Sequence, residues 1–226
     1  MSELVLLPGM NCSAQLWSGT GLDAITPQLT EPTIDDQVRV LLDELPPSFT
    51  AIGLSLGAIV AMELAIRAPE RVAALCVISA NASGPTALQR AGWDDWISQL
   101  DDGHTPRQLQ STILTRLLSE RARTQQPGLT ERVLEMGDTV GPIRLRAQLA
   151  MQLSRTDLRD RLGRLRMPTL VVSGSDDVIC PIAYHSEIAN AVPGARLVTV
   201  EGGHLLPMEN PKAVGDLVHS WLAERC

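Results

Sequence analysis

The stretch FTAIGLSLGAIVAMELA, residues 49–65, decides the fold, because an apolar run breaks at GLSLG and then resumes with helical spacing. A serine between two glycines, after a buried strand and before a helix, is the context of a nucleophile elbow. In such a turn the residues two before and two after the serine crowd the neighbouring backbone, so only very small residues fit, which accounts for Gly53 and Gly57. This context predicts Ser55 as a nucleophile. The alternative is a Gly-rich turn that only packs well.

Short apolar runs alternate with helix-period segments along the chain, which favours a parallel sheet flanked by helices. Strands are predicted at residues 4–7, 27–31, 49–54, 72–79, 169–174 and 195–201. Helices are predicted at 33–45, where Thr33 is the expected cap, at 56–68 before a proline, and at 211–224. The expected fold is therefore α/β, with a doubly wound, mostly parallel, six-stranded sheet.

The regular alternation stops after Ser79 and returns only at Pro168. The residues between them contain amphipathic helical pieces at 86–100, 107–122 and 141–156, separated by turn-rich segments. We therefore predict a core formed by residues 1–82 and 160–226, with an inserted helical cap at residues 83–159.

Composition narrows the class of protein. The 226 residues are 44% hydrophobic and 20% charged, as in ordinary globular domains. The net charge of −7 argues against a nucleic-acid partner, because phosphate binding needs a basic surface. No stretch is long and apolar enough for a membrane span, and the N-terminus lacks the pattern of a signal peptide, so the expected location is cytoplasmic. The four cysteines lack the spacing of metal ligands, so we expect no metal and no cofactor.

A nucleophilic serine needs a base, and His204 is the strongest of the four histidines. It lies in a Gly-flanked loop just after the last predicted strand, where it can reach the carboxyl edge of the sheet. His104, His185 and His219 lie in a polar turn and in helical segments, where surface or packing roles are expected.

The base in turn needs an acid, and the segment SDDVICP places Asp176 and Asp177 after the strand at 169–174. The chain order Ser, Asp, His is the one this architecture uses. The alternative is that the aspartates only end the strand and cap the next helix. The expected oxyanion donors are the backbone N–H groups of Leu56 and Met10.

Five motifs in order resemble the α/β-hydrolase superfamily. They are the first strand with PGMNCSAQLW, then GLSLGA, RAPERVAALCVIS, MPTLVVSGSDDVICP and GGHLLPMENP. In the family's acid loop the aspartate stands three residues after the glycine and four before the proline, and both counts give Asp177. The chain departs from the family pattern at Pro8, where histidine is common. It also begins at what would be the family's third strand, so the N-terminal strands are expected to be reduced.

The resemblance implies a serine hydrolase that cleaves a small-molecule ester or thioester through an acyl-enzyme, on a Ser55–His204–Asp177 triad. One alternative uses the same triad as an acyltransferase or a carrier-protein thioesterase. This alternative is suggested by a run of arginines that could bind an acyl carrier protein: Arg155, Arg159, Arg161, Arg164 and Arg166. The same run could instead be a solvated linker paired with Asp157 and Asp160. Another alternative is a non-catalytic ligand receptor on this fold. The cap residues Trp93, Trp96, Met136 and Met151 could line the acyl site, although their helical spacing also fits core packing.

Overall fold

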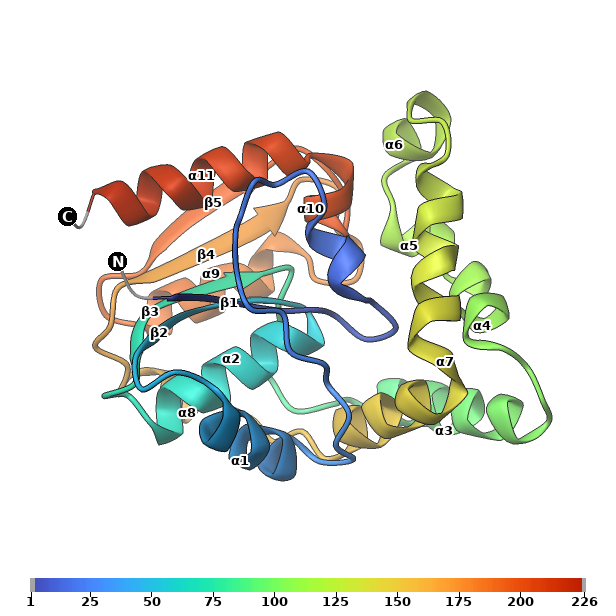
Figure 1. Ribbon diagram of the computed structural model, residues 1–226, viewed down its shortest axis with the longest axis horizontal. Helices are drawn as coiled ribbons and strands as arrows, with labels where there is room; N and C mark the ends of the chain where they lie inside the picture. The colour runs from blue at the N-terminus through green and yellow to red at the C-terminus, as the bar shows by residue number, and fades with distance from the viewer. Residues whose placement is uncertain (1–2, 225–226) are drawn as a thin grey trace.

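The computed structural model describes residues 3–224, and their central element is a parallel sheet with strand order β1-β2-β3-β4-β5 (Figure 1). The strands are β1 Glu3–Leu7, β2 Phe49–Leu54, β3 Val72–Ile78, β4 Thr169–Gly174 and β5 Arg196–Val200. Each agrees with a predicted strand to within one residue at either end. The predicted α/β class with a parallel sheet is therefore confirmed.

The predicted sixth strand, at residues 27–31, is wrong. At that edge of the sheet Ile25 forms an isolated parallel bridge with Val5. The Leu6 N–H donates to the Ile25 carbonyl over 2.8 Å, and the Ile25 N–H donates to the Leu4 carbonyl over 2.9 Å. Pairing does not extend to Pro27, two residues later, because proline has no N–H to donate. The sheet therefore has five strands and one bridging residue.

Helices cover both faces of the sheet, as a doubly wound fold requires. The helices α1 Ile34–Glu44, α2 Leu56–Arg67, α8 Arg159–Leu162 and α9 Ile182–Ala191 share one core with Val5, Ala51 and Val77. The 3₁₀ helix η1 Ala14–Trp17 and the helices α10 Leu206–Glu209 and α11 Pro211–Ala223 share the other core with Leu6, Ile52 and Ile78. Alternate residues of each strand thus enter opposite cores, as the pleat dictates.

The start of α1 follows its predicted cap. The Thr33 hydroxyl accepts a hydrogen bond from the Asp36 N–H over 3.0 Å and donates one to the Asp36 carboxylate over 2.7 Å. The Asp36 N–H and the Thr33 hydroxyl, both at the N-terminus of α1, therefore have hydrogen-bond partners within the first turn.

Between β3 and α8 the chain forms five helices, α3 Ala87–Asp101, α4 Pro106–Thr112, α5 Leu114–Leu117, α6 Glu120–Gln125 and α7 Leu129–Leu153. We call them the inserted helices. They stand to one side of the sheet, beyond the carboxyl ends of its strands (Figure 1). The long α7 bends at Gly141, whose φ is 73°, just before Pro142. The sequence prediction missed the first half of α7, although the buried Leu129, Val133, Met136 and Val140 recur there at helical spacing. Of the helices in residues 3–224, none has the length and apolar character needed to cross a bilayer.

Candidate functional site

Ser55 occupies a sharp turn between β2 and α2. Its backbone angles, a φ of 53° and a ψ of −115°, are rare for a residue other than glycine. A Cβ atom at Gly53 would lie 2.4 Å from the Gly57 carbonyl oxygen, and one at Gly57 would lie 2.1 Å from the Leu7 carbonyl oxygen. The Ser55 N–H donates to the Ile78 carbonyl over 3.0 Å. Backbone contacts on both sides thus impose the strained turn, and they explain both glycines.

His204 and Asp177 form a buried pair. Nδ1 of His204 lies 2.9 Å from Oδ2 and 3.1 Å from Oδ1 of Asp177. Oδ1 also accepts the backbone N–H groups of Ile179 and Cys180 over 2.9 and 2.8 Å, which fixes the carboxylate. The neighbouring Asp176 is exposed and accepts from the Ser175 hydroxyl instead. The structure therefore places Asp177, and not Asp176, against the histidine.

The pair shifts the pKa values of both groups in opposite directions. Burial by itself lowers the pKa of His204, but the Asp177 charge and its hydrogen bond outweigh burial and raise it. Burial would raise the pKa of Asp177, but the attraction to His204 and the hydrogen bonds that the carboxylate accepts lower it. Because Nδ1 is held by the carboxylate, Nε2 is the ring nitrogen left for proton transfer.

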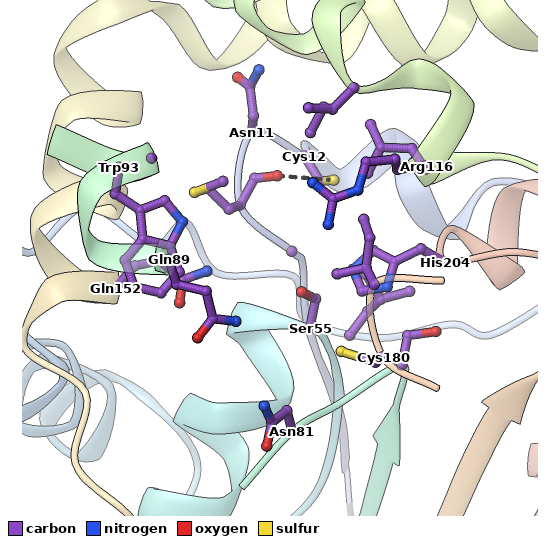
Figure 2. Close-up of a pocket in the computed structure, with 18 of the residues that line it drawn as sticks. Asn11, Cys12, Ser55, Asn81, Gln89, Trp93, Arg116, Gln152, Cys180 and His204 are labelled. Atoms are coloured by element: carbon purple, nitrogen blue, oxygen red, sulfur yellow. Dashed lines mark hydrogen bonds between the residues drawn. The ribbon is translucent and has the colours of Figure 1, made fainter. Parts of the chain in front are cut away.

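Ser55 and His204 face one cavity of about 280 Å³, which lies between the sheet edge and the inserted helices (Figure 2). Met10, Trp93 and Trp96 also line it. Leu56 directly follows Ser55, and its side chain is buried in the core. The predicted lining residues Met136 and Met151 are instead fully buried in the two cores, so for them the core alternative applies.

The remaining histidines do not reach this cavity. His185 is buried, and its Nε2 accepts the Ala80 N–H over 3.1 Å while its Nδ1 lies 3.3 Å from the Pro181 carbonyl. Burial lowers the pKa of His185, so the neutral ring is favoured. His104 and His219 are exposed. The packing role expected of His185 thus has a specific form, which is to hold the segment after β3.

Glu209 is a residue of the site that the sequence prediction missed. Its Oε1 accepts the N–H groups of Gly203 and Ser119, each over 3.0 Å, and its Oε2 accepts the Ser119 hydroxyl over 2.6 Å. This buried carboxylate joins the His204 loop to the inserted helices. The one available signal was an acidic residue at the end of the apolar segment 205–208.

One group within residues 3–224 has the ligand atoms to hold a metal ion. The carboxylate of Asp177, Sγ of Cys180 and a ring nitrogen of His204 lie within 4.8 Å of one another. The carboxylate and Nδ1 are already engaged with each other, so a metal would have to separate them. The same atoms therefore serve an imidazole–carboxylate pair better than a metal centre.

The arginine run has three kinds of environment. Arg159 pairs with Asp157 over 2.6 Å, and Arg161 pairs with the buried Glu63. Arg164 and Arg166 are exposed, whereas Arg155 is buried and lines the cavity. The expected pairing with Asp157 is present, and the run does not form one continuous basic surface.

Comparisons with known proteins agree with this fold. The family model described as alpha/beta hydrolase fold matches residues 7–211. A pimeloyl-[acyl-carrier protein] methyl ester esterase of Aromatoleum aromaticum is 29% identical over 96% of each chain. The protein of the same name from Nitrosomonas europaea is 33% identical over 74% of this chain and 68% of its own. The solved structure of a thermophilic esterase from Thermogutta terrifontis matches 99% of this chain and 90% of its own with a TM-score of 0.84 and 22% identity.

Replacing Glu209 by glutamine tests how far that carboxylate holds the loop. Glu209→Gln puts an amide donor where three protein donors now converge, so one buried donor loses its acceptor. We expect the free energy of unfolding, measured in urea, to fall by about 1–3 kcal/mol. The matched control is Glu224→Gln, an exposed carboxylate paired with Arg196, which should change it by less than about 0.5 kcal/mol. Equal losses would contradict the assigned role of Glu209.

Proposed function

The chain belongs to the α/β-hydrolase fold family, and we propose that it cleaves a small-molecule ester or thioester with Ser55 as nucleophile, His204 as general base and Asp177 as the group that orients the base. The family and its esterase relatives confirm the prediction of an enzyme that acts on ester bonds. The single observation that carries the residue roles is the buried His204–Asp177 pair, whose histidine lines one cavity with the strained Ser55.

In the proposed mechanism, Oγ of Ser55 attacks the acyl carbon while Nε2 of His204 takes the hydroxyl proton. The negative charge of the tetrahedral intermediate falls on the former carbonyl oxygen, which accepts hydrogen bonds from the N–H groups of Met10 and Leu56. When this intermediate collapses, the imidazolium returns its proton to the departing alcohol or thiol. Water then attacks the acyl-serine while His204 takes one of its protons. When the second tetrahedral intermediate collapses, His204 returns that proton to Oγ of Ser55, and the free acid leaves. Asp177 stays ionised throughout and stabilises the imidazolium.

The size of the substrate follows from the inserted helices, which we propose to act as the cap of residues 83–159. They supply Trp93 and Trp96 to a cavity of about 280 Å³, which is at the small end of ligand pockets. A short acyl group fits such a space. No cofactor enters the proposed steps, and the cytoplasmic location and the lack of a nucleic-acid partner stay predictions.

A second candidate is an acyl group carried on an acyl carrier protein. The names of the relatives favour it, as does Arg116, an exposed cation on the cavity lining (Figure 2). Association with an acidic carrier would weaken as salt rises, whereas hydrolysis of a free thioester would not. Equal salt dependence for both would leave the small-molecule proposal.

Esters of p-nitrophenol with graded acyl length test the main proposal. The wild type should release p-nitrophenol in a multiple-turnover assay, and Ser55→Ala should lower kcat/KM by roughly 10³-fold or more, because the acyl-enzyme cannot form. Equal rates in the two proteins would contradict the role of Ser55. A single turnover with the ligand held covalently would favour the receptor alternative.

The role of Asp177 predicts a specific change in the pH profile. In Asp177→Asn the charge that raises the His204 pKa is gone and the lowering by burial remains, so the acid limb of kcat/KM should move to lower pH. The maximal rate should fall by about 10⁴-fold, because the amide favours the wrong tautomer. Asp176→Asn is the control, since that side chain is exposed and bound only to Ser175. A larger loss in Asp176→Asn would reverse the assignment.

A further inference from the structure

Arg155 is a buried cation at the wall of the cavity, just after α7. Only 7% of the residue is exposed. Its Nη2 donates to the carbonyls of Asn81 and Ser83 over 3.2 and 3.0 Å, and its Nη1 donates to the Gln152 amide oxygen over 3.0 Å. The guanidinium also lies 5.9 Å from the centre of the Trp93 ring. Backbone and neutral side chains therefore fix the group in place.

These contacts leave the charge of Arg155 without a counter-ion. Among residues 3–224 no carboxylate lies within ion-pair distance of it, unlike its neighbours Arg159 and Arg161. Within the part of the chain that the structure describes, its Nε–H has no hydrogen-bond partner. Burial lowers the pKa of Arg155 to about 10, so the side chain is still charged at neutral pH. A buried charge with an idle donor is costly unless an anion joins it.

Among residues 3–224, the cavity lining as a whole also carries positive charge without a counter-ion. The chain has a net charge of −7, yet the described residues that line the cavity include Arg116 and Arg155 and no aspartate or glutamate. Two other lining residues have a buried side-chain oxygen for which residues 3–224 supply no hydrogen-bond partner, Oδ1 of Asn11 and Oγ of Ser79. Ser79 directly follows Ile78, which pairs with Leu54 and whose carbonyl accepts the Ser55 N–H. Asn81, in the segment that Arg155 binds, lines the same cavity as Ser55 (Figure 2). The unpaired donors, Nε–H of Arg155 and the hydroxyl of Ser79, are suited to the oxygens of one anion.

We propose that Arg155 binds a carboxylate carried by the substrate, so that the preferred ester or thioester is anionic. This inference rests on the proposed ester hydrolysis and names its substrate class. A carboxylate suits the site because it is small and planar, and its two oxygens can accept hydrogen bonds from a guanidinium and a hydroxyl at once. Arg155 is thus a specificity-determining residue, and the chemical step needs nothing from it beyond this contact.

Matched pairs of esters test the proposal and show which side of the ester bond carries the charge. The first pair is the mono-p-nitrophenyl ester of adipic acid against p-nitrophenyl hexanoate, where the acyl group differs by a carboxylate. The second is the hexanoate ester of 4-hydroxybenzoate against phenyl hexanoate, where the leaving group differs. We expect the wild type to prefer the charged member of one pair by about tenfold to a hundredfold in kcat/KM, the range of a charge-assisted hydrogen bond.

In Arg155→Met that preference should fall by about tenfold or more. The ratio of two kcat/KM values does not depend on the amount of folded enzyme, so it remains informative if the variant is less stable. Arg159→Met is the control, because Arg159 is exposed, paired with Asp157 and outside the cavity lining. It should keep the wild-type ratio.

Calorimetry with Ser55→Ala supplies a readout that needs no turnover. The charged ester of one pair should bind more tightly than its uncharged partner, and Arg155→Met in that background should remove the difference. A wild type without preference in either pair, or an Arg155→Met variant with an unchanged ratio, would overturn the proposal while ester hydrolysis stands. A wild type that hydrolyses no ester, but binds a charged ester more tightly than its uncharged partner in a way that depends on Arg155, would overturn the proposed function and leave the anion site intact.

Discussion

The structure depends on the close approach of the turn at Ser55 to the end of the first strand. A single Cβ at Gly57 would reach 2.1 Å from the Leu7 carbonyl oxygen, so β1, β2 and the start of α2 meet with only backbone between them. That contact forces Ser55 into positive φ and directs its side chain to the carboxyl edge of the sheet. The loops after β1, β3, β4 and β5 begin at the same edge, since all the strands are parallel.

The other parts of the site are held by contacts that join distant segments. His185 on α9 holds the loop after β3 by accepting the Ala80 N–H. Glu209 joins the His204 loop to Ser119 at the start of α6 by accepting N–H groups from both. Arg155 joins the end of those helices to the same β3 loop through the carbonyls of Asn81 and Ser83. Each of these polar groups is buried and has a specific partner, so the segments around the cavity are tied to one another.

Local signals were enough to predict much of this arrangement. The Gly-flanked Ser55, the capped helix after Thr33 and the five strands follow from short patterns that the structure repeats. The count that selected Asp177 over Asp176 agrees with the observed hydrogen bond to His204. The strand expected at 27–31 is wrong because Pro27 prevents pairing beyond Ile25. The roles of Glu209 and Arg155 could not be predicted, since each depends on a distant partner: Ser119 is 90 residues from Glu209, and Ser83 is 72 residues from Arg155.

The most direct test of the account is covalent labelling of the nucleophile. Phenylmethylsulfonyl fluoride reacts with an activated serine, and mass spectrometry of the intact protein and its peptides would locate the adduct. The account predicts one sulfonyl group, on Ser55, among all the serines of the chain, and a strong loss of labelling in His204→Gln, because the hydroxyl is activated by that imidazole. Labelling elsewhere, or equal labelling of Ser55 without His204, would contradict the assigned proton path.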